Sequence, residues 1–519
     1  MAAAAPAQPA AKKAEASHRY IITVCAMLAT LMQALDNTIA NVALPYMQGS
    51  LSATSDQITW VLTSYVIAAA IMTAPVGWLS ARFGRKNFFV VCLAGFTAAS
   101  MLCGLAESLT QIVAFRLLQG MFGAALVPLS QATMMDIYTP EERGTAMAIW
   151  GMGVMVGPIL GPTLGGYLTD VYNWRWVFYV NVPFGAVAIA GLWYFLQSNA
   201  KDESLRFDWT GFAVLSLGLC ALQLFLDRGE QKDWLGSSEI VAYLVLCGLG
   251  FYLFAVHMWL APKPFITPAI FLDRNFTTGL FIMFAVGAIL LSSSATLAPY
   301  LQNLGGYSVS ETGLLMAPRG GGTMFAMMIA GRLANRFDPR ALVVLGTLFL
   351  SYSLWDMTQW NPNVDAMAIS VNGIVQGIGL GFVFIPLNLM TFSTLPAKYR
   401  TEGTGIFSLV RNIGSAIGIS VSSVLLAQST QIMHSQIAET VTPFNRMLQT
   451  GAAYLFWNSA TAPGLASLNE EVTRQAMIVS YANDFKFMLI IGLPSAALVW
   501  LMKRPPRLAK PSHEHAVID

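Results

Sequence analysis

The sequence predicts an all-α polytopic membrane protein, and three observations support this fold class. Hydrophobic residues make up 55% of the 519 positions and charged residues only 11%, whereas about 25% of the residues in a soluble globular protein are charged. Apolar runs of about 20 residues recur along the chain, each long enough to cross a hydrocarbon core of about 30 Å. The runs are continuous and do not alternate with polar residues, which excludes a membrane β-barrel. The net charge of +2 gives no indication of nucleic-acid binding.

Polar breaks between the apolar runs divide the chain into fourteen predicted transmembrane helices. Each is long enough to span, and the ends of the seventh and ninth are the least distinct because polar residues adjoin them. The predicted spans are 20–41, 58–79, 88–106, 110–133, 144–168, 175–197, 209–226, 238–260, 276–301, 312–331, 341–360, 366–392, 403–427 and 485–502.

The distribution of positive charge predicts the orientation of these spans. Most of the 29 Lys and Arg residues fall in the tails and in loops that the spans place on one side, and this side is the cytoplasmic one. Both termini are therefore predicted to be cytoplasmic, with residues 1–19 a disordered Ala- and Pro-rich tail and residues 503–519 a second tail. The loop 428–484 is predicted on the outer face. Its segment "VTRQAMIVSYANDFKFML" has helical periodicity, which favours a small folded element or docking surface over a disordered spacer.

Two sequence patterns occur twice. The segment "GWLSARFGRK" at 77–86 is echoed 254 residues later by "GRLANRFDPR", and "RLLQGMFGAALVPLS" is echoed by "GIVQGIGLGFVFIPLN", with Gln119 and Gln376 257 residues apart. Nearly equal offsets imply duplication of a six-helix unit. Two such bundles around a midplane cavity are the architecture of alternating-access transporters. The predicted units are an N-terminal six-helix bundle at 20–197, two inserted helices at 209–260 and a C-terminal six-helix bundle at 276–502.

The first predicted span carries a carboxylate. In "LMQALDNTIANVALP", helical spacing aligns Asp36 with the amides of Gln33, Asn37 and Asn41 on one face. Asp36 lies about 24 Å along the helix at about 1.5 Å per residue, too deep for a loop. A low dielectric disfavours the charged form of a carboxylate, so we expect Asp36 to load and release protons and the amides to line a substrate cavity. A structural Asp that bonds its neighbours is the alternative.

The energy source is predicted to be an ion gradient. The chain contains no G-x-x-x-x-G-K-[ST] phosphate loop and no Gly-Lys dipeptide, so ATP is not expected to drive it. We expect a proton gradient and no cofactor or metal, with Na⁺ as an alternative. The scarcity of charge inside the spans argues against sugar phosphates or peptides as substrates. Flexible apolar walls would suit small lipophilic compounds.

Six segments together resemble the 14-span drug:proton antiporter branch of the major facilitator superfamily, and within it the EmrB-type multidrug exporters. They are "LDNTIANVALP", "GWLSARFGRK", "RLLQGMFGAA", "GPILGPTLGG", "WRWVFYVNVPFG" and "LDRGEQKDW". The resemblance implies the major facilitator fold, with two six-helix bundles plus two inserted helices. It also implies a secondary transporter, not an enzyme, that exports lipophilic drugs or toxic compounds across the inner membrane. An exporter of one metabolite, such as a siderophore or lipid-like compound, and a non-transporting membrane scaffold or sensor are alternatives, as is a channel.

The resemblance also assigns roles to charged residues. It implies that Arg116 in the fourth span biases the proton affinity of a nearby acid, the alternative being an arginine that snorkels to the interface. Gln119, one turn further on, is predicted to line the same cavity. The cytoplasmic turn at 77–86 would form a conformational latch with Asp136 as a partner. The alternative is that its cations only mark the cytoplasmic side of the membrane. The latch cations are Arg82, Arg85 and Lys86, and the acid expected at position 81 is replaced by Ala81.

The fifth span carries a glycine repeat. In "GMGVMVGPILGPTLGGYL", glycines recur one helical turn apart, which lets a neighbouring backbone approach closely. This segment resembles the one that antiporters of the superfamily carry in their fifth helix, and implies a surface that rocks without leaking; ordinary tight packing is the alternative. The glycines are Gly153, Gly157, Gly161 and Gly165, and Pro158 and Pro162 are expected to bend the helix.

The resemblance further implies partners. The outer loop 428–484 would dock an EmrA-like periplasmic adaptor, joined in turn to a TolC-like outer-membrane channel. Three other charged residues in the predicted spans have no assigned role: Arg319, Arg411 and Asp356.

Overall fold

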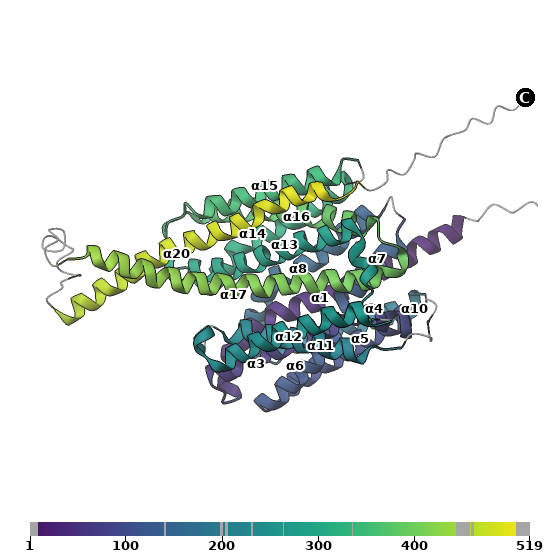
Figure 1. The fold of residues 1–519 in the computed structure, drawn as a ribbon, viewed down its shortest axis with the longest axis horizontal. Coiled ribbons are helices and arrows are strands. Elements are labelled where there is room, and N and C mark those ends of the chain that lie inside the picture. Colours follow the sequence, from purple (N-terminus) through teal and green to yellow (C-terminus); the bar gives the residue numbers. More distant parts are fainter. Residues whose placement is uncertain are drawn as a thin grey trace, which may run out of the picture.

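The computed structural model describes residues 9–504 except 140–141, 198–200, 203–205, 230–231, 263, 335, 443–456 and 458–460. Some helical side chains also lie outside the described residues, among them Asn37, Pro158 and Pro162. The fold is a long bundle of helices that run along one axis (Figure 1). We call the end at which α1 begins and the chain finishes the terminal end, and the opposite end the far end.

The helices form three groups along the chain. The N-terminal half contains α1 (Pro9–Ser50), α2 (Ser55–Ile58), α3 (Trp60–Thr73), α4 (Val76–Phe83), α5 (Arg85–Leu105), α6 (Leu109–Gly123), α7 (Leu126–Ile137), α8 (Arg143–Val171), α9 (Trp176–Tyr179) and α10 (Asn181–Phe195). The inserted pair is α11 (Trp209–Arg228) and α12 (Ser238–Leu260), joined through the 3₁₀ turn η2 (Trp234–Gly236). The C-terminal half contains η3 (Pro268–Leu272), α13 (Arg274–Pro299), the π-helical turn η4 (Tyr300–Leu304), α14 (Val309–Leu333), α15 (Pro339–Met357), α16 (Ala366–Ser393), η5 (Ala397–Tyr399), α17 (Arg400–Thr440), α20 (Ala462–Leu498) and η6 (Val499–Leu501).

The predicted all-helical fold class is confirmed, and every predicted span overlaps one to three consecutive helices. Within the described residues, ten segments are long and apolar enough to cross a membrane, or eleven when the bent pair α3 and α4 is counted as one. The helices α8, α14 and α15 occupy the three remaining predicted spans and are not among these. The count of fourteen therefore stays a prediction.

The second predicted span is bent. The axes of α3 and α4 meet at 60°, and Pro75 occupies the break between them. Proline lacks the amide hydrogen that would continue the helical ladder, so the direction changes there. The helix α4 ends at Gly84, whose φ of 82° is a conformation that side chains with a Cβ rarely adopt.

The two predicted regions outside the spans, the tail 1–19 and the loop 428–484, are partly helical in the described residues. The helix α1 already begins at Pro9, inside the predicted tail 1–19, because Ala, Lys and Glu are strong helix formers and Pro is well tolerated in the first turn. The predicted loop 428–484 is mostly the continuation of α17 and α20.

These two continuations project beyond the rest of the bundle at the far end (Figure 1). His434 of α17 and Asn469 of α20 share a hydrogen bond of 3.1 Å there, so the helices stay paired outside the bundle. We call residues 428–440 and 462–484 the far-end hairpin. The helical periodicity predicted for "VTRQAMIVSYANDFKFML" is confirmed, since this segment lies within α20.

The internal repeat is visible in contacts between the halves. Gln131 of α7 donates a hydrogen bond to Asn388 of α16, and these two residues are related by the 257-residue offset. A Cβ on Gly77 would lie 2.6 Å from Glu402 Cα, and a Cβ on its counterpart Gly331 would lie 2.5 Å from the carbonyl oxygen of Gly144. Each half therefore approaches the other closely through the glycine of its repeated turn.

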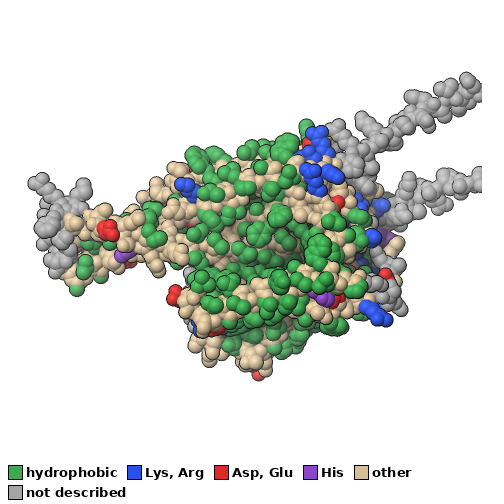
Figure 2. Space-filling model, viewed as in Figure 1, with side chains coloured by type: hydrophobic (Ala, Val, Ile, Leu, Met, Phe, Trp, Pro, Cys, Tyr) green, Lys and Arg blue, Asp and Glu red, His purple; other side chains and the backbone are tan. Residues whose placement is uncertain are grey.

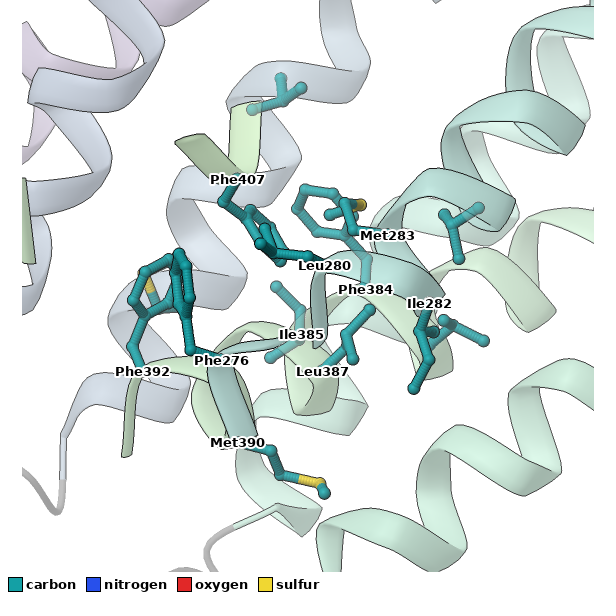
Figure 3. Packing of buried hydrophobic residues seen from close by; sticks show 14 of the residues in the cluster. Phe276, Leu280, Ile282, Met283, Phe384, Ile385, Leu387, Met390, Phe392 and Phe407 are labelled. Atoms are coloured by element: carbon teal, nitrogen blue, oxygen red, sulfur yellow. The ribbon is translucent and has the colours of Figure 1, made fainter. Parts of the chain in front are cut away.

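Apolar packing holds the interior together. In the C-terminal half, α13, α16 and α17 bring buried aromatic and aliphatic residues into one cluster (Figure 3), including Phe276, Phe392 and Phe407. On the outside, hydrophobic side chains cover the flanks of the bundle, and most of the visible Lys and Arg side chains lie toward the terminal end (Figure 2). An apolar flank with a basic end is the surface expected of a protein embedded in lipid.

Candidate functional site

Asp36 and Arg116 form an ion pair inside the N-terminal half. Arg116 Nη1 donates to Asp36 Oδ2 over 2.6 Å, and the two residues are only 1% and 0% exposed. Gln119 completes the group: its Nε2 donates to Asp36 Oδ1 over 2.8 Å and its Oε1 accepts from Arg116 Nη1 over 2.8 Å. The three side chains form a closed ring of hydrogen bonds between α1 and α6, which we call the polar ring.

The sequence of α6 accounts for half of this geometry. Arg116 and Gln119 are three residues apart, so their side chains lie on the same face, one turn from each other. Arg116 is then fixed by α3: its Nε donates to the carbonyl oxygen of Val61 over 3.0 Å, and its guanidinium lies 4.3 Å from the ring centroid of Tyr65. With 1% exposure, Arg116 does not snorkel to the membrane surface.

A cavity of about 520 Å³ lies between the two halves, beside the polar ring. Arg116, Gln33 and Asn41 line it, together with residues of α3, α11, α13 and α17. Much of its lining lies toward the far end, where α3 begins and α11 finishes.

The predicted cavity residues thus divide into two groups. Gln33 and Asn41 line the cavity, while Asn37 lies outside the described residues. Gln119 does not line it, contrary to the prediction, because its amide is committed to Asp36 and Arg116. Asp36 does not line the cavity either: it is 0% exposed and is bonded to Arg116, which does line it.

The glycine strip of α8 packs against α1. A Cβ on Gly153 would lie 3.4 Å from Met27, and Cβ atoms on the next two glycines would overlap Ala34 and Thr38. Thr38 donates a hydrogen bond of 3.2 Å to the carbonyl oxygen of Gly157, which only a close backbone approach allows. The strip consists of Gly153, Gly157, Gly161 and Gly165, and all four face α1. It therefore borders the helix that carries Asp36.

An ionic cluster joins the halves at the terminal end. Arg85 of α5 pairs with Asp136 at the end of α7, and Asp136 also pairs with Arg400 at the start of α17 over 3.2 Å. Arg85 Nη2 donates to the Thr401 hydroxyl over 2.9 Å. Asp136 is thus held between cations of opposite halves, and the bundle is bridged at this end.

Of the three predicted latch cations, the structure brings one into contact with Asp136. Within the described residues, Arg85 pairs with Asp136 but Arg82 and Lys86 do not. Lys86 Nζ lies 6.0 Å from the ring centroid of Trp193, and Arg82 Nη1 is buried without a hydrogen-bond partner. Only Arg85 is the first residue of α5, where the chain leaves the Gly84 turn toward Asp136.

Sequence reasoning missed the residues that α17 contributes to this end. Arg400 lies 257 positions after Arg143, so the repeat offset could have indicated it. Glu402 is placed beside Gly77, and its carboxylate accepts hydrogen bonds from the Thr267 backbone amide over 2.5 Å and hydroxyl over 3.3 Å. The contribution of α11 to the cavity wall was missed as well. Periodicity within one helix does not reveal which helix covers it.

The three charged residues without an assigned role have local partners. Arg319 donates to the hydroxyls of Ser293 and Ser294 on α13. Asp356 accepts from Asn372 over 2.7 Å, while the guanidinium of Arg411 reaches only its neighbour on α17, over 3.5 Å. None of the three lines the cavity.

Comparison with known proteins identifies the family. A model of the Major Facilitator Superfamily matches residues 26–419, and the Multidrug export protein EmrB of Escherichia coli strain K12 is 33% identical over 499 residues, 95% of this chain and 97% of that protein. The chain belongs to the major facilitator superfamily. Proteins of this superfamily are secondary transporters, so the chain is a multi-pass membrane transporter and not an enzyme.

Other relatives agree with this assignment. The Fatty acid resistance protein FarB of Neisseria gonorrhoeae is 33% identical over 488 residues, 93% of this chain and 96% of that protein. Among solved structures, the human organic anion transporter MFSD10 has a TM-score of 0.56 at 14% identity, with 92% of this chain and 99% of that chain covered. A bacterial homologue of the human lysosomal transporter Spinster has a TM-score of 0.54 at 16% identity, with 93% and 96% covered. These two structures support the superfamily fold.

The polar ring predicts a non-additive stability effect. Asp36→Asn leaves Arg116 without its counterion and Arg116→Gln leaves Asp36 alone, and each should cost about 3–5 kcal/mol, the cost of breaking a buried ion pair. The double variant contains no uncompensated charge and should be more stable than either single variant. Unfolding of the detergent-solubilised protein, followed by intrinsic fluorescence, measures this. Losses that simply add would contradict the pairing.

The glycine strip predicts a contrast between two alanine substitutions in the same helix. Gly157→Ala should destabilise the protein by about 1–3 kcal/mol, because the new methyl group overlaps Ala34. Gly166→Ala is the matched control, since a Cβ at Gly166 meets nothing within 4 Å, and alanine is the better helix former. Melting temperatures of both variants test this. Equal effects would show that close approach to α1 is unimportant.

Proposed function

We propose that the chain is a proton-driven antiporter that exports lipophilic drugs or toxic compounds across the inner membrane by alternating access, with both termini in the cytoplasm. The observation that carries this proposal is the buried Asp36–Arg116 pair, whose arginine also lines the cavity between the halves. The printed activities of its relatives, multidrug export for EmrB and fatty acid resistance for FarB, support export of lipophilic compounds.

In this proposal, proton coupling arises because Arg116 both pairs with Asp36 and lines the cavity. In this conformation its guanidinium neutralises Asp36. A movement that draws Arg116 into the cavity would leave a buried carboxylate without a partner, which is strongly unfavourable. Binding a proton removes that charge. Return of Arg116 to Asp36 would then displace the proton. A substrate in the cavity and a proton on Asp36 would therefore exclude each other.

The proton gradient supplies enough free energy for this exchange without a cofactor. Moving one charge across the membrane contributes about 2.3 kcal/mol per 100 mV, or about 3.5 kcal/mol at a potential of about 150 mV. Since 1.36 kcal/mol is tenfold in an equilibrium, one proton would sustain a substrate gradient of a few hundredfold.

Two structural features support alternating access. The Arg85–Asp136–Arg400 cluster bridges the halves at the terminal end, while much of the cavity lining lies toward the far end. A transporter in this arrangement offers its site to one side and seals the other. The smooth contact of α8 on α1 would let these helices shift as the cluster breaks and the opposite end closes.

The decisive experiment is exchange across a membrane. Purified protein in liposomes should show proton movement on addition of a lipophilic substrate, and Asp36→Asn should abolish it because the side chain no longer binds a proton. Asp170→Asn is the matched control, since Asp170 is an exposed acid bonded to Tyr46. A pH-sensitive dye inside the liposomes gives the readout. Coupling that survives Asp36→Asn would refute the assignment, and a wild type without proton movement would favour a scaffold.

We also propose that the far-end hairpin docks an EmrA-like periplasmic adaptor, which joins a TolC-like outer-membrane channel. The hairpin supports this because it holds two paired helices outside the bundle.

Removal of residues 436–467, closed by a short Gly-Ser linker, should abolish co-purification of the adaptor. The pump should still fold, because the deletion removes only one buried residue of α20, Gly464. The other buried residues of this helix begin at Leu468. Melting temperature controls for folding. Unchanged co-purification would refute the docking role.

A further inference from the structure

The inserted helix α11 forms one wall of the cavity. Six of its residues line it, all in its second half, from Leu219 to Arg228. The helix packs against α3 of the N-terminal half and reaches α17 of the C-terminal half, so it closes the space between them. The inserted pair is therefore part of the binding site and not only a linker.

The cavity contains one carboxylate among its described lining residues, that of Asp227 on α11. Asp227 is exposed and lines the cavity. Its hydrogen-bond donors are neutral: Gln223 Nε2 at 2.8 Å and the hydroxyl of Thr63. No described cation forms an ion pair with Asp227.

The two cations that line the cavity already have acidic partners. Arg116 of α6 pairs with Asp36 over 2.6 Å, and Arg228 of α11 pairs with Glu239 of α12 over 2.8 Å. Glu239 lies outside the cavity lining and also pairs with Lys232 over 3.5 Å. Among the described charged residues of the lining, Asp227 is therefore the one without an ion-pair partner.

Helix stability does not explain an acid at this position. Asp227 lies in the last turn of α11, where the exposed carbonyl groups make the end of a helix negative and favour basic residues. A carboxylate there opposes the helix dipole. Next to it, the walls are apolar or aromatic, with Leu222, Leu226 and Trp60 among the lining residues.

We infer that Asp227 is the subsite for the positive charge of the substrate, and that the cavity takes amphipathic organic cations in preference to anions of the same size. The apolar walls accept the body of the molecule and the carboxylate accepts its charged centre. This inference rests on the proposed export function for its physiological meaning, but the binding preference is measured independently of transport.

The test uses two ions of nearly equal size and opposite charge, tetraphenylphosphonium and tetraphenylborate. Binding of each radiolabelled ion to the full chain is measured by equilibrium dialysis in a non-ionic detergent, with empty micelles as the blank, which avoids uptake driven by a membrane potential. The wild type should bind the cation at least tenfold more tightly. Asp227→Asn should remove most of this preference, because it keeps the acceptor for Gln223 and removes the charge.

Two further variants separate charge from structure. Asp227→Glu restores the charge and should restore the preference. Asp233→Asn is the matched control: Asp233 lies in the connection to α12, outside the cavity lining, and its φ of 58° suits asparagine. It should bind both ions like the wild type. Melting temperatures of all variants verify folding.

The outcomes distinguish this inference from the proposed function. Equal binding of both ions by the wild type, or an unchanged preference in folded Asp227→Asn, would overturn the cation subsite while leaving proton-coupled export intact. A charge preference that depends on Asp227, in a protein that moves no protons in liposomes, would support the subsite and refute the antiport.

Discussion

The arrangement of the N-terminal half depends on the need to neutralise one carboxylate away from water. A bare charge in the bilayer interior is expensive, and Asp36 is neutralised by Arg116 and Gln119 together. Arg116 in turn needs the Val61 carbonyl and the Tyr65 ring, so satisfying one acid fixes α1, α3 and α6 relative to one another. The opposite side of α1 meets the glycines of α8, which let the two backbones approach closely. The helix is therefore held by the polar ring on one side and by a close glycine contact on the other.

The two halves share a fold but not a chemistry. At the interface between the halves, residues at equivalent positions of the repeat contact each other, as Gln131 and Asn388 do. The buried charged residues inside the two halves are not equivalent. The N-terminal half contains a buried acid with its arginine, whereas Arg319 of the C-terminal half is satisfied by serine hydroxyls. The C-terminal half does contain a buried acid, Asp484 of α20, but it accepts a hydrogen bond from Thr296 and forms no ion pair among the described residues.

The fold and the central pair could be predicted from the sequence, since hydropathy, repeat offset and helical spacing are properties of single segments. Asp36 and Arg116 stand out because charge inside an apolar run has few explanations. The failures have a common cause. Gln119 was assigned to the cavity because its helix face is known but its neighbour is not. The repeat offset marks Arg400, but its pairing with Asp136 appears only once α17 is packed against α7. In 428–484, low hydropathy reports contact with water and does not show where a helix ends, whereas the helical periodicity of 472–489 correctly indicated part of α20.

The continuity of α17 has a mechanical consequence. This helix begins at Arg400 in the ionic cluster, lines the cavity with residues such as Ser415, and runs without a break to Thr440 in the far-end hairpin. At about 1.5 Å per residue, its 41 residues form a rod about 60 Å long. A rod pivoting at the cavity converts a small tilt at the terminal end into a larger sideways displacement of its tip. A tilt that opens the ionic cluster would therefore move the far-end hairpin further than it moves the cluster itself.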